Sequence, residues 1–342
     1  MMSEPVDVVI LGAVRHARTY AAHIATRADL RVVALAEEVC ASEAMRETAR
    51  RLADDLRVPL HDASRLEGAA LALICSEPTR HARLVALALA QGINVLCDKP
   101  LATSADDLAV IEDAAQEADV WCAVVTRALA PAVQAARAIV ESGRIGLPRS
   151  VDVEFLSDDA YLRENPDEIS LILDASLSGG GELMNFLGYP IDVVRVITGC
   201  EPVDVYARAG ALTLPAHVAA GVEDIGTASL AFSNGLMVSV LAGRVPVVPQ
   251  PGNGTFTIRI IGSHGHLEFD ADGPLIREFG RGGERIVRLD RSAVDAVFDD
   301  VVRVVRSGGR LRYDHRDAAV AVRTIEAAYR SVSSGRVESV AL

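Results

Sequence analysis

The sequence predicts an α/β protein: an amino-terminal Rossmann domain with a doubly wound parallel sheet, then an α+β domain with an open, mostly antiparallel sheet. Up to about residue 125, runs that are apolar throughout alternate with helical stretches, which is typical of parallel strands covered on both faces. From residue 149 on, strand-like runs follow one another and partly alternate, which favours an antiparallel sheet. We expect domains at residues 1–127 and 128–342, with carboxyl-terminal helices that can pack back on the first domain.

In the first part of the chain, each apolar run ends at a glycine or at charged residues and prolines. Parallel sheets bind ligands at the carboxyl ends of their strands, so these ends are the expected place for chemistry. The predicted strands are 6–13, 30–38, 69–78, 93–100 and 120–127, and the predicted helices are 17–27, 40–56, 80–92, 104–118 and 131–143.

The second part contains consecutive strands at turn spacing, with a hairpin turn at Ser233–Gly235. The helix 181–199 interrupts them, and two helices near 293–307 and 315–335 close the chain. The predicted strands are 149–157, 203–212, 225–233, 236–245, 255–263 and 266–272.

Composition excludes several classes of function. The formal charge of −13 argues against nucleic acid or an anionic membrane surface as the main partner. No apolar run reaches the ~18 residues that a membrane span needs. The amino terminus lacks a basic signal region and the five scattered cysteines suggest reduced thiols, so we expect a cytoplasmic protein. Neither these cysteines nor the eight histidines show the spacing of a metal site.

The segment VLCDKPLATS holds Lys99, the one lysine among the 34 lysines and arginines of the chain. Arginine stays charged at any ordinary pH, whereas a lysine can release its proton when its surroundings lower its pKa. Lys99 also lies at the end of a predicted strand. It is therefore a candidate for proton chemistry, and the alternative is that one lysine survived by chance in an arginine-biased chain.

The segment ILGAVRHA joins a strand, a tight turn and a helix start, which are the parts of a dinucleotide site. Gly12 fits the first glycine of G-x-G-x-x-G, whereas Val14 and Ala17 replace the second and third. Valine hinders close approach of a pyrophosphate, for which Arg15 and His16 can compensate as phosphate donors. An ordinary strand–helix turn is the alternative. The predicted cofactor loop comprises Gly12, Ala13, Val14, Arg15 and His16.

Three further strand ends carry polar residues. At the end of ALAEEV, Glu37 (with Glu38 in reserve) can bond ribose hydroxyls and repel a 2′-phosphate, so NAD is favoured over NADP. A solvated carboxylate is the alternative. Prolines in CSEPTRHARL and LCDKPLATS turn the chain across the sheet and shape a ledge, where Asp98 can hold Lys99 or bond a ribose. The further predicted cofactor residues are Ser76, Glu77, Pro78, His81, Asp98, Lys99 and Arg127.

These motifs together resemble the Gfo/Idh/MocA oxidoreductases. VLCDKPLATSADDL is similar to their E-K-P-L-A segment, with Asp98 for the usual glutamate, and LSGGGELMNFLGYPIDVVRVITG is similar to their G-G-G-x-L-x-D-x-G-x-H-x-x-D helix. The similarity runs nearly end to end. It implies a Rossmann domain followed by an open-sheet domain, and an NAD(P)-dependent enzyme that oxidises a sugar or cyclitol hydroxyl or runs the reverse reduction. It also implies a homodimer or homotetramer formed through the open sheet.

The resemblance also implies roles for single residues. Lys99 falls on the lysine beside the nicotinamide and the reacting hydroxyl, Asn185 on the helix aspartate, and Tyr189 on the family's histidine, while Asp192 matches. A tyrosine titrates near ~10 unless a nearby charge such as that of Lys99 lowers its pKa. We interpret Tyr189 as the proton-transfer group, Lys99 as polarising the oxygen and Asn185 as orienting the substrate. The alternative is that Tyr189 merely packs.

Two other functions remain open at this point. The replacements at Val14, Asn185 and Tyr189 fit a lapsed member that binds a nucleotide or sugar as a sensor or partner subunit. A tightly held cofactor, reduced and reoxidised in one cycle, would give a net isomerisation or elimination. We expect substrate specificity to come from the loops 156–170 and 244–254. The first of these loops carries Asp158, Asp159 and Arg163.

Overall fold

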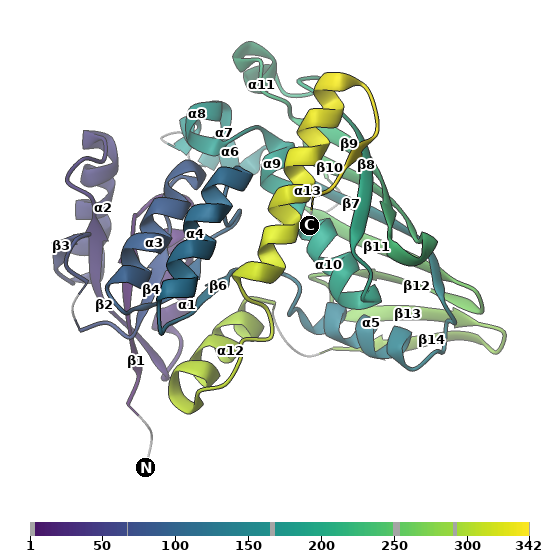
Figure 1. Ribbon diagram of the computed structural model, residues 1–342, viewed down its shortest axis with the longest axis horizontal. Coiled ribbons are helices and arrows are strands. Elements are labelled where there is room, and N and C mark those ends of the chain that lie inside the picture. Colours follow the sequence, from purple (N-terminus) through teal and green to yellow (C-terminus); the bar gives the residue numbers. More distant parts are fainter. Residues whose placement is uncertain (1–3, 67, 165–167, 249–253, 290–292, 342) are drawn as a thin grey trace. The chain divides into compact units, whose positions relative to one another are not determined.

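The computed structural model describes residues 4–66, 68–164, 168–248, 254–289 and 293–341. The chain forms two compact units, one of residues 1–125 and 298–319 and the other of residues 126–297 and 320–342. Each unit is built around its own β-sheet (Figure 1). Helices α12 (Ala293–Ser307) and α13 (His315–Ser334) each begin in one unit and end in the other.

The first unit has a six-stranded parallel sheet. Its strands are β1 (Val6–Leu11), β2 (Leu30–Glu37), β3 (Leu60–Asp62), β4 (Leu71–Ile74), β5 (Asn94–Cys97) and β6 (Cys122–Val124). Its helices are α1 (Ala17–Ala25), α2 (Glu43–Leu56), α3 (His81–Ala90), which follows the 3-10 turn η1 (Pro78–Arg80), and α4 (Ala105–Glu117). The order β3-β2-β1-β4-β5-β6 confirms the predicted Rossmann architecture, and it changes direction between β1 and β4, where such sheets bind ligands.

Local chemistry explains where these elements begin. Gly12 follows β1 with φ of 79°, and a Cβ there would lie 2.9 Å from the carbonyl oxygen of Cys75, so only glycine fits without strain. The hydroxyl of Ser42 accepts from the amide of Met45 and caps α2, and Ser104 caps α4 in the same way. The strand ends and helix starts of this unit are therefore fixed by the local sequence.

The second unit has a nine-stranded sheet. Its strands are β7 (Pro148–Asp158), β8 (Pro202–Gly210), β9 (Ile225–Phe232), β10 (Met237–Val245), β11 (Thr255–Gly262), β12 (Gly265–Asp270), β13 (Leu275–Gly280), β14 (Gly283–Arg288) and β15 (Glu338–Ser339). Its helices are α5 (Pro131–Glu141), α6 (Ala160–Glu164), α7 (Ser170–Leu173), α8 (Ala175–Ser178), α9 (Glu182–Phe186), α10 (Gly188–Thr198) and α11 (Pro215–Ala220). The order is β14-β13-β12-β11-β7-β10-β9-β8-β15, and β7 and β10 run parallel while the other pairs are antiparallel.

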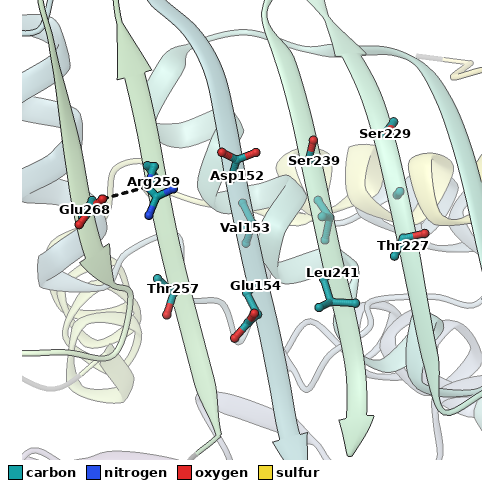
Figure 2. Close-up of a pocket in the computed structure, with 12 residues that line it drawn as sticks. Asp152, Val153, Glu154, Thr227, Ser229, Ser239, Leu241, Thr257, Arg259 and Glu268 are labelled. Carbon is teal, nitrogen blue, oxygen red and sulfur yellow. Dashed lines mark hydrogen bonds and ion pairs between the residues drawn. The ribbon is translucent and has the colours of Figure 1, made fainter. Parts of the chain in front are cut away.

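The two faces of this sheet differ in polarity because side chains alternate along each strand. One face packs its apolar residues against α5, α10 and the later part of α13 in a continuous core. The other face carries exposed polar side chains around a concavity of about 500 Å³, where Arg259 pairs with Glu268 at 2.9 Å (Figure 2). The polar residues that line it include Asp152, Glu154, Thr227, Ser229, Ser239 and Thr257.

The structure departs from the predicted elements at a few places. The helix predicted over 181–199 is divided into α9 and α10 at Leu187, because Pro190 has no N–H to continue the hydrogen-bond ladder. Strands β13 and β14 went unpredicted, and β14 is too exposed to show an apolar pattern. The loop 156–170 contains the end of β7 and the helix α6, and residues 165–167 and 249–253 of the two predicted loops lie outside the described residues.

Every helix among the described residues is too short or too polar to span a bilayer. The described residues also contain no group of three or more histidine, cysteine, aspartate or glutamate side chains placed to hold a metal ion.

Candidate active site

The carboxyl ends of β1, β4 and β5 bring three predicted segments to one edge of the first sheet. The amide of Val14 donates to the carbonyl of Cys75 at 3.0 Å, and the amide of Asp98 donates to the carbonyl of Ile74 at 2.9 Å. Parallel pairing of neighbouring strands therefore aligns the cofactor loop with the two proline-containing segments. The side chain of Val14 is buried, so it packs inward rather than standing out from the loop.

Asp98 has a buried carboxylate, which contacts one residue of helix α1 and the residue that comes just before this helix. The Tyr20 hydroxyl donates to Oδ1 at 2.8 Å, and His16 Nδ1 lies 2.8 Å from Oδ2. Burial alone would raise the pKa of Asp98, but the neighbouring His16 and Lys99 charges hold this pKa well below its usual value. Asp98 is therefore an ionised carboxylate directed at α1, and its negative charge favours the charged form of the adjacent Lys99. The Lys99 residue is half-buried, and a cis peptide bond joins it to Pro100.

His81 connects two of these strand ends from within the unit. Its ring nitrogens lie 2.6 Å from the carbonyl oxygen of Pro100 and 3.1 Å from that of Ser76. The ring is 1% exposed, and burial lowers its pKa. His81 thus links the segment that carries Lys99 to the segment Ser76–Pro78. The His81 side chain is buried in the unit and is not exposed at this edge of the sheet.

Glu37, at the end of β2, lies in a buried group of charges centred on Arg80. Arg80 Nη1 donates to Glu37 Oε1 at 2.8 Å and to Glu38 Oε2 at 3.0 Å, and its Nε lies 2.6 Å from Glu77 Oε1. Burial alone would lower the pKa of Arg80, but the carboxylates hold it above its usual value. Sequence reasoning missed Arg80 because its partner Glu37 is 43 residues away, although an arginine within CSEPTRHARL is a visible signal.

In the second unit, Tyr189 lies in the first turn of α10 and is 9% exposed. Its ring meets Phe155 edge to face, with centroids 5.4 Å apart, and the Arg127 guanidinium carbon lies 4.4 Å from its ring centroid. Arg127 also pairs with Asp272 at 2.7 Å. Burial alone would lower the pKa of Arg127, but the Tyr189 and Asp272 oxygens hold it above its usual value. Arg127, predicted to contact the cofactor, is therefore a cation beside the phenol within this unit.

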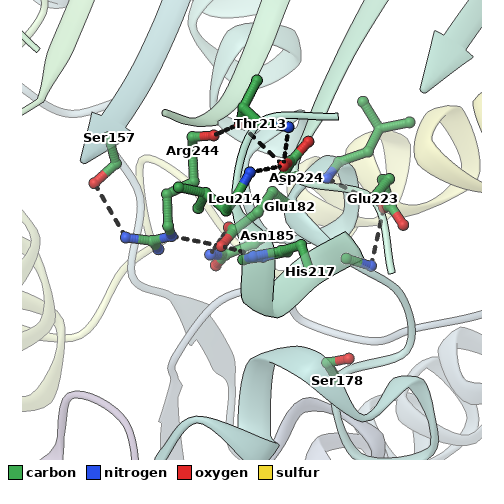
Figure 3. A network of polar contacts seen from close by, with 12 residues as sticks. Ser157, Ser178, Glu182, Asn185, Thr213, Leu214, His217, Glu223, Asp224 and Arg244 are labelled. Carbon is green, nitrogen blue, oxygen red and sulfur yellow. Dashed lines mark hydrogen bonds and ion pairs between the residues drawn. The ribbon is translucent and has the colours of Figure 1, made fainter. Parts of the chain in front are cut away.

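The half-buried Asn185 belongs to a network centred on the fully buried Glu182 (Figure 3). Glu182 accepts from Arg244 Nε at 2.6 Å and from Asn185 Nδ2 at 2.7 Å, and His217 Nε2 lies 3.4 Å away. Burial alone would raise the pKa of Glu182, but Arg244 above all, with His217 and Asn185, lowers it to about 2. The carboxylate fixes the Asn185 amide, whose NH₂ group faces Glu182. The Arg244 guanidinium also donates to the carbonyl of Asp158 at 2.6 Å.

Sequence reasoning missed Glu182, His217 and Arg244. Arg244 is a charge within an otherwise apolar strand, and Glu182 follows directly after three glycines, so both carried a weak signal. Asp192, which the sequence placed with Tyr189, is buried on α10.

A second polar cluster, formed by Tyr329 and Glu223, holds the glycine segment that precedes α9. The Tyr329 hydroxyl donates to Glu223 and accepts from the amides of Gly181 at 3.2 Å and Met184 at 3.1 Å. A Cβ on Gly180 would lie 2.2 Å from the Tyr329 oxygen, so the segment can approach this closely only as glycine. Burial and Glu223 raise the pKa of Tyr329, which keeps its hydroxyl a donor. The start of α9, and with it Asn185, is fixed by this contact.

Comparison with known proteins identifies the family. Residues 6–126 match the oxidoreductase family with an NAD-binding Rossmann fold, and residues 133–268 match the GFO/IDH/MocA C-terminal domain. Inositol 2-dehydrogenase of Rhizobium meliloti (strain 1021) is 23% identical over 97% of this chain and 98% of its own length. D-xylose 1-dehydrogenase (NADP(+)) 2 of Haloferax volcanii is 27% identical over 95% of this chain and 94% of its own.

A solved structure of levoglucosan dehydrogenase, in complex with NADH and levoglucosan, superposes with a TM-score of 0.84 over 99% of this chain and all of that chain, at 19% identity. At this low identity the structural similarity supports the fold alone, whereas the two family matches rest on the sequence. The chain therefore belongs to the Gfo/Idh/MocA family of oxidoreductases, as its sequence motifs indicated.

Proposed function

We propose that this protein transfers hydride between NAD and a hydroxyl-bearing carbon of a sugar or polyol. Membership of an oxidoreductase family with an NAD-binding fold supports the cofactor class, and the names of the relatives support the substrate class. We assign dinucleotide binding to residues 1–127 and substrate binding to residues 128–342. The observation that carries the proposal is Lys99, which lies beside the ionised Asp98 at the strand ends where this fold binds its cofactor.

The residues of the first unit fit a dinucleotide. Gly12 allows the tight turn after β1, which packs against the backbone of Cys75 and Ser76. The start of α1 offers backbone N–H groups to a phosphate, and Glu37 lies at the end of β2, where this fold binds the ribose. NAD, when bound, supplies the hydride acceptor. The absence of an arginine directly after Glu37 and Glu38 favours NAD over NADP.

The chain's own residues supply the proton chemistry in this proposal. Lys99 polarises the alcohol oxygen, and the negative charge of the adjacent Asp98 stabilises its positive charge. Tyr189 takes the hydroxyl proton, and the permanently charged Arg127 beside its ring favours the phenolate. Asn185, held by Glu182, orients a substrate hydroxyl. Asp192 completes the predicted site on α10.

A direct experiment separates the enzyme from a lapsed family member. The purified protein is mixed with NAD or NADP, and thermal shift and nicotinamide fluorescence report binding. NADH formation is then followed with a panel of inositols, aldoses and anhydrosugars. Binding with turnover on at least one member supports the proposal. Binding of NAD without turnover on any of them supports a sensor or partner subunit, for which the asparagine and tyrosine at 185 and 189 provide the reason.

A further inference from the structure

Arg127 joins a carboxylate to a phenol within the second unit. Both oxygens of Asp272 accept from Arg127 Nε, at 2.9 and 2.7 Å, and the Tyr189 hydroxyl is a second hydrogen-bond partner of the same guanidinium. The guanidinium carbon lies 4.4 Å from the centroid of the Tyr189 ring. Because the bonds to Asp272 use Nε, the two terminal nitrogens remain available to other partners. Arg127 therefore contacts Asp272 and the proposed proton-transfer group at the same time.

The carboxylate of Asp272 lies in a tight turn that follows β12. Asp270 Oδ1 accepts from the Asp272 amide at 2.9 Å, and the carbonyl of Asp270 accepts from the amide of Gly273 at 3.0 Å. Asp270 Oδ2 accepts from the Phe256 amide at 2.9 Å, which ties the turn to β11. An aspartate that bonds the backbone two residues further on fixes the chain direction there. The backbone that carries Asp272 is therefore held independently of Arg127.

The phenol ring on the other side of Arg127 is also fixed by its neighbours. The Tyr189 ring centroid lies 5.4 Å from that of Phe155 and 6.4 Å from that of Phe256, and these two phenylalanine rings are 4.7 Å apart. A ring packed in this way keeps its place when one polar contact is changed. Arg127 thus spans two groups whose positions are set by the rest of the unit.

The two charges of the ion pair act on the phenol in opposite directions. A cation beside a phenol favours the phenolate, whereas a carboxylate bonded to that cation offsets part of its charge. Arg127 stays protonated at every pH at which a tyrosine titrates, so its charge is constant. The side chains of Arg127 and Asp272 are 27% and 38% exposed, so water weakens the offset without removing it.

We propose that Asp272 is a positioning residue, which holds Arg127 against Tyr189 and limits how strongly this cation favours the phenolate. The inference rests on the proposed role of Tyr189 and adds the ion pair that controls it. If the pair only stabilised the fold, loss of either partner would change the site in the same way. The proposal requires the two losses to have opposite effects on the phenol.

Other charged groups lie on the elements that pack around Tyr189. They are Asp192 on α10, Glu182 on α9, Asp158 at the end of β7, Arg137 and Glu141 on α5, and Arg323 and Glu326 on α13. Strands β7 and β11 also carry Asp152, Glu154 and Arg259, on the opposite face of the sheet. The proposed mechanism adds Lys99 of the first unit. All of these groups are the same in the variants compared below, so a difference between Asp272 and Arg127 variants reports the ion pair.

The test titrates the phenol without substrate or cofactor. Tyrosinate absorbs at longer wavelength than tyrosine, so the ultraviolet difference between each protein and the same protein with Tyr189→Phe reports this one ionisation. The proteins are the wild type, Asp272→Asn and Arg127→Met. Glu268→Gln is the matched control, because Glu268 accepts from Arg259 at 2.9 Å on the open face of the sheet. Circular dichroism confirms the fold at each pH.

We expect the midpoint to fall by roughly one pH unit in Asp272→Asn and to rise by roughly one unit or more in Arg127→Met, at low salt. Glu268→Gln should leave it unchanged. In an active enzyme, the acid limb of the kcat profile should show the same two shifts, because the phenol must lose its proton to act as a base.

The inference is wrong if both substitutions move the midpoint in the same direction or if Asp272→Asn leaves it in place. Should Arg127→Met not fold, Asp272→Glu takes its place. Restoring the carboxylate should return the midpoint toward the wild-type value, and a midpoint equal to that of Asp272→Asn would contradict the proposal. Because the titration needs no turnover, a wild type that oxidises no polyol would refute the proposed function and leave this result readable.

Discussion

Asp98 in the first unit and Glu182 in the second are both buried carboxylates whose partners keep them ionised, yet they are assembled differently. The partners of Asp98 come from α1 and the residue before it, and one of them, His16, has a side chain 31% exposed. The partners of Glu182 come from α9, α11 and the end of β10, and Glu182 and His217 are fully buried. The first arrangement borders solvent at a ligand-binding edge, whereas the second stabilises the scaffold that carries Asn185.

The largest effect is expected from breaking the buried network. Glu182→Ala leaves Arg244 buried without its ion-pair partner, which should lower the free energy of unfolding by about 3–5 kcal/mol. Urea unfolding measures this loss. The matched exposed pair is Arg137–Glu141, at 2.7 Å, for which Glu141→Ala should cost at most about 1 kcal/mol. Equal losses in the two variants would show that the network contributes no more than a surface ion pair.

The second largest effect is expected on turnover, from a substitution of Tyr189. Tyr189→Phe removes the proposed proton acceptor but keeps the ring that packs on Phe155, so kcat should fall roughly 10²- to 10⁴-fold with little change in melting temperature. Tyr206→Phe is the control, because the Tyr206 hydroxyl contacts Arg208 on the same strand β8, outside the proposed site. Retained turnover in Tyr189→Phe would mean that this tyrosine only packs.

The smallest effect concerns acid sensitivity. The folded-state pKa values of Asp98 and Glu182 lie below their ordinary values, so the unfolded chain binds more protons than the folded one as the pH falls. Their stabilisation is present above pH ~4.5 and is lost below it, for Glu182 as the pH falls toward about 2. Asp98→Asn should therefore flatten the fall in unfolding free energy between pH ~5 and ~2. An unchanged slope in this variant would exclude Asp98 as a source of acid sensitivity.

Much of the first unit could be predicted because its information is local. Apolar runs, caps and the glycine after β1 set strands, helices and the loop at the strand ends, and the Rossmann order was confirmed. The second sheet was correctly predicted to be mostly antiparallel. Strand β14 was not predicted, because its exposed side chains give no apolar pattern.

The side-chain partners could not be predicted in the same way. Tyr20 meets Asp98 across 78 residues, Arg80 meets Glu37 across 43, and Arg244 meets Glu182 across 62. Such pairs depend on which elements become neighbours in the folded chain, and the local pattern around each residue does not encode that. The roles assigned to Lys99, Tyr189 and Asn185 accordingly stay predictions that kinetics must test.

The most direct test of the central claim is the NAD-dependent turnover of Lys99→Arg, measured as NADH formation on a polyol that the wild type oxidises. Arginine keeps the positive charge beside Asp98 but spreads it over a larger planar guanidinium, which cannot take the place of the compact ammonium at the alcohol oxygen. We predict unchanged NAD affinity and a loss of turnover of roughly 100-fold or more. Wild-type turnover in Lys99→Arg would contradict the proposed role of the Lys99 ammonium in polarising the alcohol oxygen.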